Sequence, residues 1–192
     1  MKTVDVEFAL LPETLETPVR EALAAAGLGR CVRSEDVHAD TVPKVLVLGV
    51  LGTPLKAESF LDSDPAAWWD RIETALVSVF ERLERVSAMA AHGGGRLVLV
   101  VDDAGVCGTA DRSTGSALGG AAIAMTKSLA REFSPLGVAV NAVAVQSHLL
   151  EHPDGSYPME VAETITFLAD AELDHLTGQI VACNAATLRT RI

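Results

Sequence analysis

Short apolar runs alternate with helical patterns along the chain. The apolar runs lie at residues 4–10, 45–50, 97–101, 138–145 and 179–183. Most of them are apolar throughout, which is typical of parallel strands covered on both faces. Between them, apolar residues recur every three or four positions, as they do on an amphipathic helix. This alternation predicts an α/β fold with a parallel sheet and helices on both faces.

Capping residues predict where the helices begin and end. Thr17–Pro18 predicts a helix start, with a hydroxyl cap and proline at the first helical position, and Gly27 predicts its end. The longest helix is predicted to follow Asp64–Pro65 and to run to the glycines at 93–95, and two further helices are predicted at about 116–132 and 158–168. We expect one side of the longest helix to face the core and the other a subunit interface. Its apolar positions are Trp69, Ile72, Leu76, Val79 or Phe80, Leu83 and Val86.

Composition limits the classes of function. The 192 residues are 49% hydrophobic, which suits one folded domain. Because 26 acidic residues outnumber 15 Lys and Arg, giving a net charge of −11, nucleic acids and anionic membrane surfaces are unfavourable partners. The sequence has no signal-peptide pattern and no membrane-length apolar run, so a cytoplasmic protein is expected. Cys31, Cys107 and Cys183 are widely spaced, which favours free thiols over a disulfide framework or a zinc site.

Four stretches in the later part of the chain resemble a known family. They are WWDRIETALVSVFERL, GGGRLVLVVDDAG, AAIAMTKSLAREFSPLGVAVNAVAV and MEVAETITFLADAELDHLTGQIVACNAA. Their order and separations resemble the short-chain dehydrogenase/reductase family, most closely its 3-oxoacyl-[acyl carrier protein] reductases. The resemblance covers residues 45–192, whereas residues 1–44 are divergent. It implies a single domain over residues 1–192 with a Rossmann-like, doubly wound parallel sheet, truncated in the N-terminal, cofactor-binding half.

The resemblance also identifies the positions at which the family carries its catalytic side chains. The family's tyrosine corresponds to Gly115, its lysine to Gly119, its serine to Asp102 or Asp103, and its asparagine to Leu76. Glycine has no side chain to transfer a proton, and a carboxylate would repel the oxyanion that a serine hydroxyl favours. We therefore predict that none of these positions is catalytic.

The cofactor segments are altered as well. A dinucleotide needs a glycine-rich turn directly after the first strand, where backbone N–H groups approach the pyrophosphate. Here residues 11–16 read Leu-Pro-Glu-Thr-Leu-Glu, with no glycine and two carboxylates. The family's Asn-Asn-Ala-Gly, Pro-Gly and Asp-Gly-Gly correspond to Gly-Val-Leu-Gly at 49–52, Val-Gln at 145–146 and Asn-Ala-Ala at 184–186. We predict that the chain binds neither NAD(P) nor a metal.

Residues 114–119 spell a TGxxxG pattern that resembles a phosphate-binding turn. The pattern follows a long loop instead of following a strand directly, so it lacks the context that a phosphate site requires. We instead interpret Gly115, Gly119, Gly120 and Ala121 as small residues that let a helix approach another backbone closely.

Two other patterns could suggest chemistry. Residues 148–152 spell HxxEH, an inverted zinc-protease motif, but Pro153 follows at once and favours a surface loop with solvated histidines. Asp102 and Asp103 end a predicted buried strand, where open α/β sheets place their sites. Such a pair could bind a cation or act as a base, although we favour two solvated carboxylates.

Three functions fit these patterns. The first is a catalytically inactive subunit that pairs with and stabilises or completes an active NAD(P)-dependent reductase, because the family's interface helices are the best-preserved stretches. The partner would bind the NAD(P), and the family suggests acyl thioester or polyketide-type substrates. The second is an enzyme that uses Asp102, Asp103, His148 or His152. The third is a self-associating scaffold or ligand-binding protein.

Overall fold

The computed structural model describes residues 6–38, 41–51, 58–150, 156–173 and 175–184. These residues form a six-stranded, entirely parallel sheet with the strand order β2-β1-β3-β4-β5-β6. The predicted α/β class with a Rossmann-like parallel sheet is therefore confirmed. The strands are β1 (Val6–Ala9), β2 (Cys31–Arg33), β3 (Val45–Val50), β4 (Gly95–Asp102), β5 (Val138–Val145) and β6 (Ile180–Cys183).

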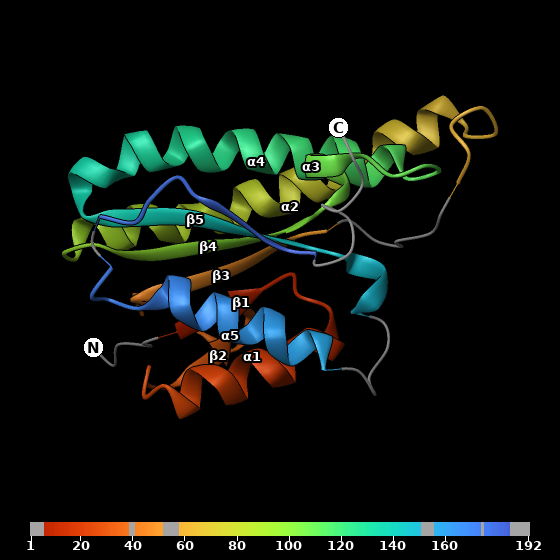
Figure 1. The fold of residues 1–192 in the computed structure, drawn as a ribbon. Helices are drawn as coiled ribbons and strands as arrows, with labels where there is room; N and C mark the ends of the chain where they lie inside the picture. Colours follow the sequence, from red (N-terminus) through yellow and green to blue (C-terminus); the bar gives the residue numbers. More distant parts are fainter. Residues whose placement is uncertain (1–5, 39–40, 52–57, 151–155, 174, 185–192) are drawn as a thin grey trace.

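Helices cover both faces of the sheet (Figure 1). One face is covered by α1 (Glu13–Ala25) and α5 (Tyr157–Ala169), and the other by α2 (Pro65–Ala91) and α4 (Ser113–Phe133). The short helix α3 (Ala104–Cys107) follows β4 and packs against α4. Three single turns, η1 (Ser34–Asp36), η2 (Ser134–Leu136) and η3 (Ser147–Leu149), complete the described elements. Within the described residues, no helix combines the length and apolar character that a membrane span needs.

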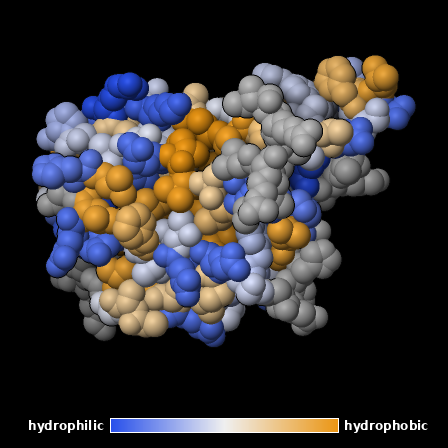
Figure 2. All heavy atoms as spheres, in the orientation of Figure 1, coloured by the Kyte–Doolittle hydropathy of each residue, from blue (hydrophilic) through white to orange (hydrophobic). Residues whose placement is uncertain are grey.

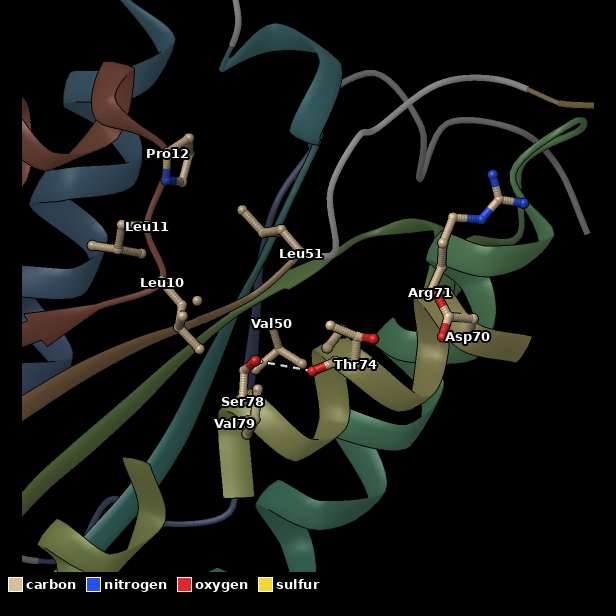
Figure 3. A pocket seen from close by; sticks show the side chains of 12 residues that line it. Leu10, Leu11, Pro12, Val50, Leu51, Asp70, Arg71, Thr74, Ser78 and Val79 are labelled. Carbon is tan, nitrogen blue, oxygen red and sulfur yellow. Dashed lines mark hydrogen bonds between the residues drawn. The ribbon is translucent and has the colours of Figure 1, made fainter. Parts of the chain in front are cut away.

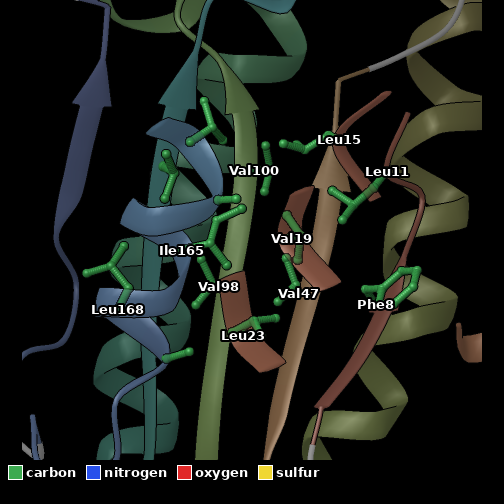
Figure 4. Packing of buried hydrophobic residues seen from close by; sticks show 14 of the residues in the cluster. Phe8, Leu11, Leu15, Val19, Leu23, Val47, Val98, Val100, Ile165 and Leu168 are labelled. Atoms are coloured by element: carbon green, nitrogen blue, oxygen red, sulfur yellow. The ribbon is translucent and has the colours of Figure 1, made fainter. Parts of the chain in front are cut away.

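Both faces of the central strands are buried, which explains their unbroken apolar sequence. In β4, Val98 and Val100 point to the layer of α1 and α5, where they pack with residues such as Ile165 (Figure 4). Leu97 and Leu99 of the same strand point to the layer of α2 and α4. A side-chain period of two on a strand covered from both sides leaves no position for a solvated residue.

The start of α1 differs from the prediction at Thr17–Pro18, which is wrong. The helix begins at Glu13, after Pro12, whose carbonyl oxygen accepts hydrogen bonds from the N–H groups of Leu15 (2.9 Å) and Glu16 (3.1 Å). Leu15 is fully buried, so the apolar stripe that anchors the helix begins one turn before the predicted cap. Pro18 lies inside the helix, where it has no N–H to donate to the carbonyl group of the preceding turn.

The longest helix begins as predicted. The Asp64 carboxylate caps α2 by accepting hydrogen bonds from the N–H groups of Ala66 (3.4 Å) and Ala67 (3.2 Å). The predicted apolar positions divide between two sides of this helix. Ile72, Val79 and Val86 are buried, as is Met89, whereas Trp69 and Phe80 are 59% and 72% exposed.

Candidate functional site

Three polar side chains close the carboxyl ends of β4 and β5. Asp102 is the last residue of β4, Ser147 begins η3 just after β5, and Arg112 precedes α4. The Asp102 Oδ2 atom accepts hydrogen bonds from Arg112 Nη2 (3.0 Å) and from Ser147 Oγ (2.5 Å), while Arg112 Nη2 also lies 2.6 Å from Ser147 Oγ. The Asp102 Oδ1 atom accepts from the N–H of Ala104 (2.9 Å). We call Asp102, Arg112 and Ser147 the buried triad.

The expectation that Asp102 and Asp103 are solvated is wrong. Only 1% of Asp102 and 5% of Asp103 is exposed. The Asp102 carboxylate can be buried because hydrogen bonds from Arg112, the Ser147 hydroxyl and the N–H of Ala104 replace its lost hydration. Asp103 turns away from the triad, with its Oδ2 atom 3.5 Å from Asn184 Nδ2. Since both oxygens of Asp102 already accept hydrogen bonds, this carboxylate is a poor candidate for a general base.

The triad lies beside Gly115 and Gly119, the glycines that the family resemblance aligns with the tyrosine and lysine. A Cβ atom at Gly115 would lie 3.4 Å from Asp102 Oδ2, so these two positions face each other. At Gly119 a Cβ atom would lie 2.6 Å from the Asp102 carbonyl oxygen and 3.0 Å from the Gly105 Cα atom. No side chain fits at Gly119 without a shift of backbone. Leu76, the fourth position, is half-buried in the middle of α2.

The TGxxxG pattern at 114–119 lies entirely inside α4, which begins at Ser113. The interpretation of its glycines as close-approach residues holds for Gly119, which packs on Gly105 of α3. At Gly120 a Cβ atom would meet open space within this chain, so a close approach at that position stays a prediction. A helix rotates by about 100° per residue, so adjacent glycines face different surroundings.

Tyr157 lies at the next strand ends, as the first residue of α5. Its hydroxyl accepts a hydrogen bond from the N–H of Gln146 (2.7 Å) and donates to the carbonyl oxygen of Cys183. Burial raises the pKa of Tyr157 above its ordinary value of 10.0, because the anion would lose hydration. Burial also raises the pKa of the Cys183 thiol, which lies 3.1 Å from Thr164 Oγ1. These groups connect β5, β6 and α5 and stay in their neutral forms at neutral pH.

A cavity of about 410 Å³ lies at the carboxyl ends of β1 and β3, beside the N-terminal half of α2 (Figure 3). One wall is apolar and comes from the two strand ends, and the other comes from α2. We call it the β1–β3 cavity. Its lining consists of Leu10, Leu11, Pro12, Gly49, Val50, Leu51, Asp70, Arg71, Thr74, Ala75, Ser78 and Val79.

The turn between β1 and α1 forms the rim of this cavity. Leu10 has a φ of 57°, a left-handed conformation that costs a leucine about 1–2 kcal/mol. Its carbonyl group lies against Gly49, where a Cβ atom would come within 2.1 Å of the oxygen. Pro12 has no N–H to offer, and Glu13 follows at the start of α1. This turn does not fit a pyrophosphate, which needs glycine N–H groups and no opposing carboxylate.

Of the HxxEH pattern, the structure describes only the first part. His148 is exposed in η3, while Glu151 and His152 lie outside the described residues. In the part of the chain that the structure describes, no three His, Cys, Asp or Glu side chains form a group that could hold a metal ion. Cys31, Cys107 and Cys183 are free thiols, as expected.

Sequence patterns did not identify Arg112 or Ser147. Neither residue belongs to a motif, and they are separated from Asp102 by ten and 45 positions. The β1–β3 cavity could not be predicted from the sequence either, because its walls come from a strand-end turn and from a helix about 60 positions away. The one sequence signal for both was the position of Asp102 and Leu10 directly after apolar strands.

Comparisons with known proteins identify the family. The short chain dehydrogenase family model matches residues 39–148. The chain is 31% identical over 136 residues to the 3-oxoacyl-[acyl-carrier-protein] reductase FabG of Vibrio cholerae, covering 61% of this chain and 56% of FabG. It is 28% identical over 167 residues to Nodulation protein G of Azospirillum brasilense, covering 77% and 68% of the two chains.

A solved structure shares the fold. An oxidoreductase of the short chain dehydrogenase/reductase family from Burkholderia thailandensis superposes with a TM-score of 0.75 at 17% identity, over 95% of this chain and 92% of that one. The present chain spans little more than half the length of the FabG relatives it matches. With the family model matching more than half of its residues, the chain belongs to the short chain dehydrogenase family.

Proposed function

We propose that this chain is a catalytically inactive member of its family that pairs with an active NAD(P)-dependent reductase and stabilises or completes it. The acyl-carrier-protein reductases among its relatives favour an acyl thioester or polyketide-type substrate for the partner. The observation that carries the proposal is the buried triad. It joins Asp102, one of the two positions that the resemblance gives to the family's serine, to Arg112 in an internal ion pair beside Gly115.

The packing around Gly119 supports the loss of chemistry. A lysine at this position would drive its Cβ atom into the Asp102 carbonyl oxygen, at 2.6 Å. The segment cannot regain the family's lysine by one substitution, because α3 and α4 touch through backbone atoms there. An active site that is merely empty would leave room for such a side chain.

The exposed side of α2 supports the pairing. Trp69, Val77 and Phe80 are 59%, 51% and 72% exposed, and half-buried Leu76 and Leu83 lie along the same side of the helix. Large apolar side chains that gather on one helix face are typical of a surface that a partner covers. This helix is one of the two long helices that the family resemblance assigns to subunit contacts.

The apolar surface extends beyond the body of the protein. The turn before α2 protrudes and carries hydrophobic side chains, seen at the upper right of Figure 2. Phe60 and Leu61 in this turn are 66% and 93% exposed, and the Phe60 ring packs edge-on against Trp68 at 6.4 Å between ring centres. We include this turn in the proposed interface with the reductase.

Co-expression with an active short-chain reductase encoded beside this chain tests the proposal. Size-exclusion chromatography with mass measurement should give a mixed complex for the wild-type chain. Phe80→Glu should abolish that complex, because it places a charge at the centre of the apolar face. Leu136→Glu is the matched control: Leu136 is 52% exposed in η2, away from this face, and its substitution should leave the complex intact.

Two outcomes would contradict the pairing. A wild-type chain that forms only its own oligomer and ignores the reductase would favour a self-associating scaffold. A mixed complex that survives Phe80→Glu as well as it survives Leu136→Glu would show that the α2 face is not the contact.

A further inference from the structure

We propose that the β1–β3 cavity is a binding site for an uncharged, largely apolar small molecule. The site would lie where the rest of the family holds a charged dinucleotide, and it would use different chemistry. The inference concerns this chain alone and holds whether or not the chain pairs with a reductase.

The size and position of the cavity suit a ligand. Its volume of about 410 Å³ is within the range of small-molecule pockets, about 300–1,000 Å³. It opens at the carboxyl ends of two parallel strands, where open α/β sheets bind their ligands. Both walls come from well-packed elements, since Val50 and Val79 are buried on their strand and helix. The cavity is therefore preformed.

Its lining is mostly apolar. Leu10, Pro12, Val50 and Leu51 provide the strand-end wall, as Figure 3 shows. On the α2 wall, the Ser78 hydroxyl is already bonded to the carbonyl oxygen of Thr74 (2.9 Å). A ligand would gain most of its affinity by burying apolar surface against these side chains.

The charges around the cavity disfavour an anion. The Asp70 carboxylate lies in the lining, and Glu13 follows Pro12 at the rim. Among the lining residues that the structure describes, the positive charge is that of Arg71, whose Nη2 atom is bound to Glu58 at 2.7 Å and whose guanidinium points away from Leu10 and Val50 in Figure 3. Its buried Nε atom has no hydrogen-bond partner within the described part of the chain, so a neutral acceptor on a ligand could bind there. The carboxylates of Asp70 and Glu13 would repel an anionic molecule, whereas an uncharged one would avoid this repulsion.

The conformation of Leu10 is the strongest single indication of a ligand in the cavity. It is held in a left-handed conformation in which glycine would be free of strain, and it is still 42% exposed. A strained, exposed leucine stabilises neither the backbone nor the core. Strain of this kind persists where the side chain has a task, and here the side chain stands at the mouth of an apolar cavity.

Two fluorescent probes that differ by one charge test the proposal. N-phenyl-1-naphthylamine is uncharged and apolar, and 8-anilino-1-naphthalenesulfonate is the same ring system with a sulfonate. We expect one molecule of the uncharged probe to bind per chain, at least tenfold more tightly than the sulfonate. NADPH should show no binding in the same titration.

Cavity variants locate the binding. Ala75→Trp, from the α2 wall, should fill the cavity and weaken the uncharged probe at least tenfold. Ala124→Trp adds the same side chain to an exposed position of α4 and should leave binding unchanged. Leu10→Gly suits its left-handed backbone, so it should fold even if Ala75→Trp does not, and it should weaken the probe several-fold.

Three results would overturn the site. The first is probe binding that neither Ala75→Trp nor Leu10→Gly weakens, which would indicate adsorption to an exposed surface such as the α2 face. The second is tighter binding of the sulfonate than of the uncharged probe. The third is NADPH binding that Ala75→Trp abolishes, which would also contradict the proposed loss of cofactor binding.

Discussion

The two halves of the sheet's carboxyl edge have opposite characters. At β4 and β5 the edge carries the buried triad, whose three side chains are joined by hydrogen bonds and an ion pair. At β1 and β3 the edge is hollow and lined mainly by apolar side chains. Polar groups that bond to one another thus occupy one half of this edge, and a cavity opens in the other. A fold and its function can separate at the level of a few side chains.

Among substitutions at the β4 and β5 ends, we expect the loss of Arg112 to reduce the free energy of unfolding most. Arg112→Met would leave the Asp102 carboxylate buried without its cation, which should reduce the free energy of unfolding by about 3–5 kcal/mol. Arg71→Met removes a partly exposed ion pair with Glu58 and should cost about 1 kcal/mol or less. Urea denaturation of both variants checks this contrast. Equal losses would show that the triad is no more than a surface ion pair.

Two neighbouring glycines test how tightly α3 and α4 close the half at β4 and β5. Gly119→Ala should destabilise the protein by about 1–3 kcal/mol, because its Cβ atom meets backbone that cannot move freely. Gly120→Ala meets open space and should stabilise it by about 0.5–1 kcal/mol, since alanine is the better helix former. Thermal and urea denaturation should therefore give opposite signs. A neutral Gly119→Ala would mean that the helices can separate and that the site is less closed than described.

Tyr157 connects the ends of β5 and β6 through its hydroxyl group. It should make the stability of the protein fall at alkaline pH. Tyr157→Phe removes two hydrogen bonds and should cost about 1–2 kcal/mol at pH 8. Because burial raises the folded-state pKa of Tyr157, its contribution is complete below pH 10, the ordinary value of tyrosine, and is lost as pH rises above it. Between pH 8 and pH 11 the wild type should lose more unfolding free energy than the variant. An equal loss in both would place the alkaline transition elsewhere.

Substitution in the open half, at β1 and β3, should change the stability of the protein least. Leu10→Gly relieves a strained backbone but adds freedom to the unfolded chain, so the two effects should cancel to within about 0.5 kcal/mol. The same denaturation measurements check this value. A loss of more than about 2 kcal/mol, the size expected of a core leucine, would show that Leu10 supports the fold and is not reserved for a ligand.

The sequence predicted the parts of the fold whose physics is local. The strand at 138–145 was predicted with the limits that the structure shows, because a β-branched, mainly apolar run begins directly after Gly137 and ends where polar residues follow. The cap at Asp64 and the glycines after α2 fixed that helix within two residues. In contrast, Cys31–Arg33 forms a three-residue strand through pairing with β1, and nothing in its own composition indicates it.

The candidate site was less predictable. The pattern placed Asp102 at a strand end but could not show that Arg112 and Ser147 would enclose it, because their approach depends on how α4 and η3 pack. A carboxylate pair at a strand end is ordinarily solvated, and the tertiary ion pair reversed that expectation. The apolar pattern placed Trp69 and Phe80 in one series with Ile72 and Val86 and could not separate a core side from an interface side, whereas the structure leaves Trp69 and Phe80 exposed. Their interpretation as part of an interface stays a prediction.

Native mass spectrometry of the chain co-expressed with its neighbouring reductase tests the central claim most directly, because it counts chains and nucleotides together. The account predicts a mixed complex in which the number of NAD(P) molecules equals the number of reductase chains. One NAD(P) on every chain, or two separate homo-oligomers, would contradict it.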